Sequence, residues 1–207
     1  MSNSKTILII LDGWGHGDKS KSDAIFHAKT PYIDFLYKNY PNSELLTDGE
    51  KVGLPNGQMG NSEVGHLNIG AGRIVDQDLV KINKACSDNS ITTNKNLQKS
   101  FQHVKENNSS LHIMGLVSDG GIHSHIDHLY KLIDVAQEEN VKSIYLHAFT
   151  DGRDCDPNSG LNFIKELTDR LNGPKLATVC GRYYAMDRDK RWERIKKSYD
   201  AMVYGIG

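Results

Sequence analysis

The chain has 207 residues, with 25 Lys and Arg against 26 Asp and Glu, and this even charge balance excludes nucleic-acid binding through bulk positive charge. Hydrophobic residues make up 38% of the chain, a value typical of folded domains, which excludes a disordered chain. The first apolar run, residues 7–11, ends at Asp12 and is too short for a membrane span or a secretory leader, so we expect a cytoplasmic protein without a membrane partner.

The first part of the chain predicts one strand, one helix and a long loop. Residues 6–11 form an uninterrupted apolar and β-branched run, which is typical of a strand buried in a parallel sheet. Thr30 followed by Pro31 predicts the start of a helix that ends before Pro41. Seven glycines between residues 47 and 75 predict a loop with tight turns.

Strands alternate with helices in the second part of the chain. The predicted strands are residues 111–117, 141–149 and 176–180, and a helical pattern follows each of them. This alternation predicts an α/β fold with mostly parallel sheets and flanking helices. The Asn- and Ser-rich residues 87–96 predict a flexible connector, and we place a domain boundary near residues 73–80.

Charged side chains follow the carboxyl ends of all three predicted strands, where ligands bind in open parallel sheets. Several arginines in one concave site require an anion, and their forked donors match carboxylate and phosphate oxygens, so a small phosphorylated acid fits best. Each of these residues taken alone is better explained as a turn residue with a solvated charge, and their joint recurrence at three strand ends favours the site. The charged residues at these strand ends are Asp119, Asp151, Arg153, Asp154 and Arg182, with Arg188 six residues further on.

Asp12 and Ser62 form a second candidate site. A carboxylate at a strand end suits a hard divalent metal, and a serine flanked by small residues suits an exposed nucleophile that such a metal activates. The structural alternatives are that Asp12 begins a β-turn and that Ser62 caps a helix. Among the nearby histidines we favour His123 as a substrate-binding or proton-handling residue and interpret His125 and His128 as structural.

Five segments of the chain resemble, in order, signatures of the cofactor-independent (2,3-bisphosphoglycerate-independent) phosphoglycerate mutases of the alkaline-phosphatase-like superfamily. The resemblance extends from Lys5 to Gly207. It implies that residues 1–75 are the amino-terminal piece of a phosphatase-like domain and that residues 76–207 belong to an inserted, incomplete substrate domain. The five segments are LDGWG (11–15), MGNSEVGHLNIGAGR (59–73), DGGIHSH (119–125), DGRD (151–154) and GRYYAMDRD (181–189).

The resemblance implies the interconversion of 3-phosphoglycerate and 2-phosphoglycerate in glycolysis and gluconeogenesis, without bisphosphoglycerate as a cofactor. Ser62 would take the phosphoryl group, and Asp12 together with Ser62 would bind one of two manganese ions. Asp154 would handle the proton. The implied substrate-binding residues are His123, Arg153, Asp154, Arg182 and Arg188.

Members of this family are longer, and their second half carries the remaining metal ligands. The resemblance therefore implies an amino-terminal portion of a parent enzyme that is monomeric, whereas the isolated portion has uncertain activity and is expected to self-associate. Two alternatives remain open at this point. One is another metal-dependent phosphomutase or phosphatase of the same superfamily, and the other is a non-catalytic fragment that binds phosphoglycerate.

Overall fold

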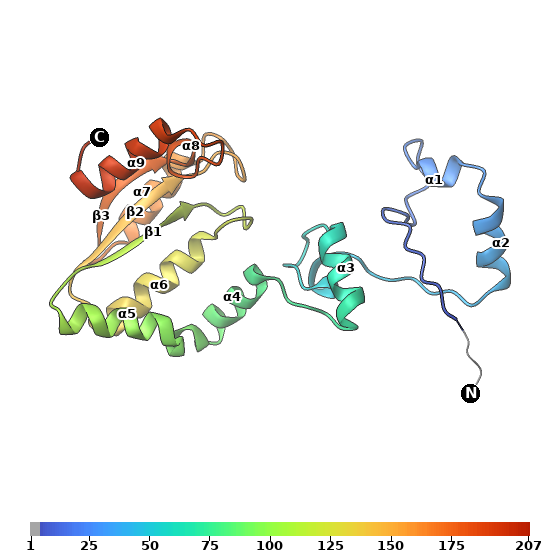
Figure 1. Cartoon of the computed structure of the whole chain (residues 1–207), viewed down its shortest axis with the longest axis horizontal. Helices are drawn as coiled ribbons and strands as arrows, with labels where there is room; N and C mark the ends of the chain where they lie inside the picture. Colours follow the sequence, from blue (N-terminus) through green and yellow to red (C-terminus); the bar gives the residue numbers. More distant parts are fainter. Residues whose placement is uncertain (1–4) are drawn as a thin grey trace. The chain divides into compact units, whose positions relative to one another are not determined.

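A computed structural model describes residues 5–207, and the chain divides into two compact units, residues 1–77 and 78–207 (Figure 1). The first unit is helical, and its core is small, since its buried cluster consists of Val52, Leu54 and Val64. Its elements are α1 (Ala24–His27), α2 (Pro31–Asn39), the 3₁₀ helix η1 (Gly49–Val52) and α3 (Ser62–Ala71).

Helix α2 begins where the sequence predicts, with Thr30 as N-cap and Pro31 at the first helical position. Helix α3 corrects the prediction that residues 47–75 are mostly loop. The Asn61 side chain caps α3 by accepting a hydrogen bond from the N–H of Val64, and Gly72 ends it in the left-handed conformation. A good cap at each end therefore outweighs the glycines within this helix.

The predicted strand at residues 6–11 is wrong, because these residues form no strand in the described chain. Their side chains are exposed, with Ile7 84% and Leu8 73% accessible. A strand requires a neighbour that completes its backbone hydrogen bonds, and no segment of residues 5–77 pairs with this run. Apolar composition alone therefore cannot make it a strand.

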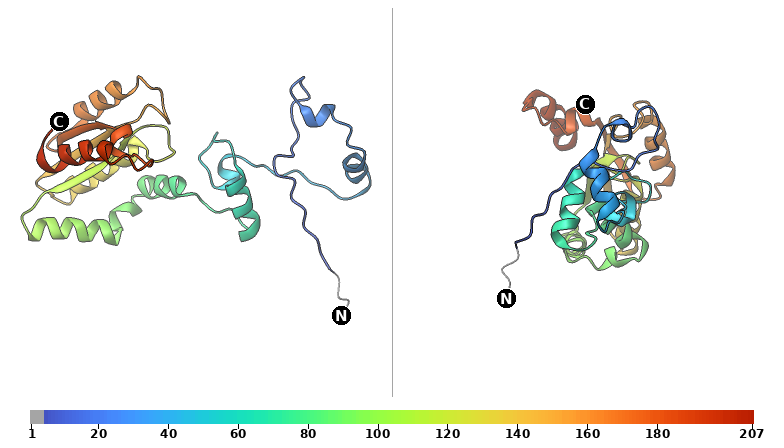
Figure 2. Two further views of the ribbon diagram at one scale, coloured as in Figure 1. Left: turned by 45° about the horizontal axis from the view of Figure 1, so that its top comes forward. Right: turned by 90° about the vertical axis from the view of Figure 1, so that its right-hand side faces the viewer.

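The second unit is a three-layer α/β arrangement with one parallel sheet in the order β1-β2-β3. Figures 1 and 2 show α6 on one side of this sheet and α9 on the other. The α/β class and the parallel sheet predicted from the sequence are therefore confirmed. The elements are α4 (Asp78–Ser87), η2 (Ser90–Thr93), α5 (Lys95–Glu106), β1 (Leu111–Val117), α6 (Ile126–Glu138), β2 (Ile144–Thr150), α7 (Gly160–Arg170), β3 (Lys175–Gly181), α8 (Arg182–Ala185) and α9 (Trp192–Tyr204).

One face of the sheet packs against α5, α6 and α7 to form the main core. Alternate residues of β2, such as Leu146 and Ala148, contribute to it, and Leu167 of α7 is fully buried there. Burial of this apolar face stabilises the unit and fixes the register, because a slip by one residue would turn the apolar side chains to the other face. The carboxyl ends of the three strands are thereby held in line.

Residues 87–96 are not a flexible connector as predicted. They contain the end of α4 and the 3₁₀ helix η2, and the Asn94 side chain caps α5 by accepting hydrogen bonds from two backbone N–H groups. Asn and Ser therefore mark helix ends here, and their abundance alone does not distinguish a cap from a linker. Within residues 5–207, no helix is long and apolar enough to cross a membrane.

Candidate active site

The carboxyl end of the sheet in the second unit carries a compact cluster of charged side chains. Nη1 of Arg182 lies 2.7 Å from Oδ1 of Asp151 and 2.7 Å from Oδ2 of Asp154, so one guanidinium nitrogen bridges two carboxylates. The side chains are 13%, 0% and 8% exposed, respectively. His123 approaches the same Asp154 oxygen, with Nε2 at 3.9 Å. The cluster thus combines a buried cation, two carboxylates and a half-exposed imidazole.

The topology of the sheet explains why these residues meet. Asp151 and Asp154 follow β2, while Arg182 follows β3, and parallel strands end at the same edge. The loop after β1 lies against the Asp154 loop at Gly120, where a Cβ would be 2.4 Å from the Asp154 carbonyl oxygen. Only glycine allows this approach without a backbone shift.

Asp151 is fixed in the ionised state. Burial by itself raises its pKa, but the nearby Ser118 hydroxyl together with hydrogen bonds from the backbone N–H of Arg153, from Arg182 and from the N–H of Asp154 holds the pKa well below its usual range. For Arg182, burial alone lowers the pKa, whereas Asp154 and Asp151 raise it to a net value above the ordinary one. Asp151 and Arg182 are therefore both charged at neutral pH.

Arg153 and Arg188 differ from Arg182, because both are exposed. Among residues 5–207, no hydrogen bond or ion pair engages either of their guanidinium groups, so the structure does not bring them into the Arg182 cluster. The loop that carries Arg188 is nevertheless held firmly. Asp187 accepts hydrogen bonds from two backbone N–H groups of this loop and forms a 3.0 Å ion pair with Arg194.

Asp12 and Ser62 meet in the first unit. Ser62 is the first residue of α3, and its hydroxyl donates a hydrogen bond of 2.5 Å to Oδ2 of Asp12. Asp12 and Gly13 form a turn closed by a hydrogen bond from the N–H of Trp14 to the Leu11 carbonyl. A Cβ on Gly60 would lie 1.8 Å from the Thr47 carbonyl oxygen, so glycine is required beside the serine. The helix cap is Asn61 and not Ser62, which leaves the serine hydroxyl available to Asp12.

A carboxylate and a hydroxyl are hard oxygen donors, and their contact fits the donor chemistry of a divalent cation such as manganese. They supply two ligands of the six that such a cation takes. Within the described part of the chain, no group of three or more His, Cys, Asp or Glu side chains is placed to hold a metal. Asp12 and Ser62 therefore fit a metal centre as part of its ligand set.

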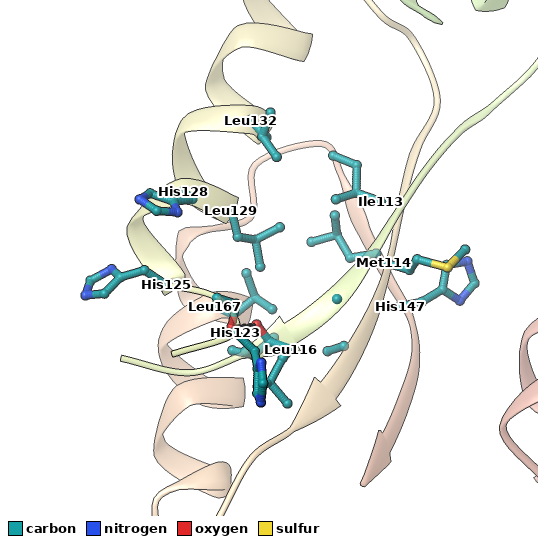
Figure 3. Close-up of a pocket in the computed structure, with 15 residues that line it drawn as sticks. Ile113, Met114, Leu116, His123, His125, His128, Leu129, Leu132, His147 and Leu167 are labelled. Carbon is teal, nitrogen blue, oxygen red and sulfur yellow. Dashed lines mark hydrogen bonds between the residues drawn. The ribbon is translucent and has the colours of Figure 1, made fainter. Parts of the chain in front are cut away.

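The histidines after β1 do not form a metal site. His125 caps α6 by accepting a hydrogen bond from the N–H of Asp127, and Nε2 of His128 lies 2.6 Å from Oδ1 of Asn83. His125 and His128 are among the residues that line a cavity of about 210 Å³, and Figure 3 shows their rings at the outer side of α6 while Leu129 and Ile113 lie between α6 and β1. Their contacts are those of structural residues.

Sequence reasoning placed Asp151 at a strand end but gave it no role. Its position three residues before Asp154 is a usable signal, because aspartate side chains accept hydrogen bonds from backbone N–H groups two and three residues later. Asp187 forms a related anchor in its own loop, where it accepts hydrogen bonds from backbone N–H groups two and four residues later. Neither pattern reveals the arginine that completes each anchor, since both pairings depend on the tertiary structure.

Comparison with known proteins gives consistent results. The family described as BPG-independent PGAM N-terminus matches residues 82–207. The chain is 59% identical over 207 residues to the 2,3-bisphosphoglycerate-independent phosphoglycerate mutase of Parabacteroides distasonis, covering 99% of this chain and 41% of that relative. The mutase of the same name from Clostridioides difficile is 54% identical over 210 residues, covering 100% and 41%. The chain thus spans about two fifths of the length of these curated relatives.

A solved structure is also similar. A phosphoglycerate mutase of Leishmania mexicana, whose crystal structures were determined at low cobalt concentration, matches with a TM-score of 0.67 and 34% identity. The match covers 95% of this chain and 38% of that protein. Because the family match covers more than half of the chain, the resemblance stated from the sequence is confirmed, and the chain belongs to the family of BPG-independent phosphoglycerate mutases.

Proposed function

We propose that the chain supplies the amino-terminal part of an enzyme that interconverts 3-phosphoglycerate and 2-phosphoglycerate in glycolysis and gluconeogenesis. In this proposal the first unit is the piece of a phosphatase-like domain that carries the nucleophile, and the second unit is the substrate domain. The observation that supports it best is the charged cluster at the carboxyl ends of β1, β2 and β3, within the part of the chain that matches the family. The reaction takes place in the cytoplasm, on a small-molecule substrate.

Ser62 is proposed to attack the phosphoryl group of the substrate, giving a phosphoserine and bound glycerate. Its hydroxyl proton is directed to Asp12, at 2.5 Å, and its position at the start of α3 places helix N–H groups beside the phosphate that forms. Asp12 and Ser62 would hold one of two manganese ions. When bound, the metal makes the serine hydroxyl easier to deprotonate and offsets the phosphate charge.

Arg153, Arg182 and Arg188 are proposed to bind the substrate anion, with His123 as a further contact. The guanidinium donors of Arg153 and Arg188 are free within the part of the chain that the structure describes, and such donors match carboxylate and phosphate oxygens, while Arg182 retains donors beyond Nη1. Asp154 handles the proton of the glycerate hydroxyl. Retention of glycerate between the two transfer steps distinguishes a mutase from a phosphatase, and the arginines supply it.

A hybrid enzyme tests the proposal. The region of the Parabacteroides distasonis mutase that aligns with this chain is replaced by this chain, and formation of 2-phosphoglycerate is measured with added manganese and without bisphosphoglycerate. We expect the hybrid to turn over. Arg153→Ala and Arg188→Ala should each reduce kcat/KM by at least about 30-fold, because each removes a desolvated, charge-assisted contact with the substrate. Lys142→Ala is the control, because Lys142 is an exposed cation just before β2, at the opposite edge of the sheet.

The outcomes of this test distinguish the proposed mutase from its alternatives. An unsubstituted hybrid that folds but forms no 2-phosphoglycerate overturns the proposed function. Release of phosphate from several esters without isomerisation identifies a phosphatase of the same superfamily instead. Equal activity of the Arg153 and Lys142 variants shows that Arg153 is a solvated surface residue, and its assigned role is then wrong.

A further inference from the structure

The proposed reaction leaves Asp151 unused, although it is the most completely enclosed carboxylate of the cluster. Its side chain is 0% exposed. Oδ1 accepts three hydrogen bonds, from the backbone N–H of Arg153 at 2.9 Å, from the N–H of Asp154 at 3.1 Å and from Nη1 of Arg182 at 2.7 Å. One oxygen therefore holds the backbone of two proposed site residues and the side chain of a third.

The bond to Arg182 has an electrostatic consequence. The same Nη1 atom lies 2.7 Å from Oδ2 of Asp154, so two carboxylates share one guanidinium nitrogen. With Asp151 present, the negative charge of Asp154 receives only part of the stabilisation that an unshared ion pair with Arg182 would give. If Asp151 lost its negative charge, Arg182 would form an ion pair with Asp154 alone and would stabilise the ionised form of Asp154 more strongly. Asp151 thereby competes with Asp154 for the positive charge of Arg182.

The backbone contacts have a separate, geometric consequence. Arg153 and Asp154 are consecutive, and their amide groups are tied to one fixed point at the end of β2. The loop after β1 also packs closely against this segment at Gly120, so the segment is fixed both by Asp151 and by that loop. The guanidinium of a long, exposed side chain such as that of Arg153 is positioned accurately only when the backbone that carries it is fixed.

We propose that Asp151 is a positioning residue of the mutase site: its charge divides Arg182 between two carboxylates, and its Oδ1 fixes the loop that presents Arg153 and Asp154. This inference rests on the proposed function. The two roles are separable, because Asn keeps an oxygen acceptor for the loop N–H groups but lacks the charge, and Ala lacks both. Asp151 itself exchanges no proton, in line with its permanently ionised state.

The test compares Asp151→Asn and Asp151→Ala in the hybrid enzyme described above. For Asp151→Asn we expect kcat to fall about 10- to 100-fold with KM within about threefold, because the Oδ1 acceptor still fixes the loop while Asp154 becomes the only carboxylate that opposes the charge of Arg182. For Asp151→Ala we expect the same loss in kcat and a KM raised at least about tenfold. The matched control is Asp134→Asn, which removes an equal charge from a half-exposed ion pair with Arg170.

A purely structural acceptor gives a different pattern, which overturns the inference. In that case Asp151→Asn would match the unsubstituted hybrid in kcat and KM, and Asp151→Ala would lower only the amount of folded protein, measured by near-UV circular dichroism and urea unfolding. An inactive unsubstituted hybrid overturns the proposed function as a whole. An active hybrid with a fully active Asp151→Asn variant overturns this inference alone.

Discussion

Gly120→Ala tests whether the Asp154 loop is held as closely as the structure shows. The added Cβ would lie 2.4 Å from the Asp154 carbonyl oxygen and 2.9 Å from the carbonyl carbon. Ordinary contact begins at 3.4 Å, so the two loops would have to separate by about 1 Å. The obstructing atoms belong to the backbone and cannot rotate away. We therefore expect Gly120→Ala to lower the free energy of unfolding by about 1–3 kcal/mol, the range measured for overpacked sites.

Gly115→Ala is the matched control for this prediction. Gly115 lies in β1, five residues earlier, and a Cβ there would meet nothing within 4 Å. The same chemical change is expected to leave the stability unchanged or raise it by up to about 1 kcal/mol, because Ala loses less backbone entropy on folding. Neither glycine has a positive φ, so strain of that kind does not separate the two variants.

The measurement is urea unfolding followed by far-UV circular dichroism, with both variants and the unsubstituted chain under the same conditions. A difference of at least about 1 kcal/mol between the two alanine variants supports the close contact. If Gly120→Ala is as stable as Gly115→Ala, the loops are free to separate. The argument that Gly120 fixes the position of Asp154 would then be refuted.

Three further predictions address the core, the pH dependence and the nucleophile. Leu167→Ala should lower the free energy of unfolding by about 2–5 kcal/mol, since this side chain is 0% exposed in the core, and unchanged urea unfolding would contradict the packing. Burial and the neighbouring His112 lower the pKa of His147 below its ordinary 6.5, so unfolding takes up a proton and the free energy of unfolding should fall as the pH drops below about 6.5. His147→Asn should reduce this pH dependence in urea unfolding, and an unchanged pH dependence would contradict the role of His147. In the hybrid enzyme, Ser62→Ala should abolish phosphoenzyme labelling while substrate affinity measured by calorimetry stays within about tenfold, and retained label would exclude Ser62 as nucleophile.

The second unit was predictable because its strands are local apolar runs between clear breaks. Residues 111–117 coincide with β1, and the helix that begins at Trp192 follows directly from its apolar spacing. The first unit was harder, because the run at residues 6–11 is as apolar as β1 but finds no strand to pair with among residues 5–207. Residues 62–71 were predicted to be mostly loop, with a helix cap at Ser62 as the alternative, because glycine frequency does not reveal the Asn61 cap of α3. Local patterns thus predict elements whose partners are near in the sequence.

The site, like the fold, was predictable only in part. Parallel topology sufficed to predict that Asp154 and Arg182 lie at one edge of the sheet. The sequence could not predict that Arg182 is already bonded to two carboxylates, because this pairing depends on how closely the loops approach at Gly120. It also could not distinguish this arginine from Arg153, since both follow strands and both carry five donors.

That distinction changes how an anion would be bound. With one of its nitrogens shared by Asp151 and Asp154, Arg182 contributes little net positive charge to the cluster. In the proposed function, recognition of phosphate and carboxylate therefore depends more on the free guanidinium groups of Arg153 and Arg188. Each projects from a loop whose backbone a buried aspartate fixes, with side chains 0% exposed for Asp151 and 2% for Asp187. The buried carboxylates would thus act by holding the arginines in place, so that binding the anion does not require ordering the loops as well.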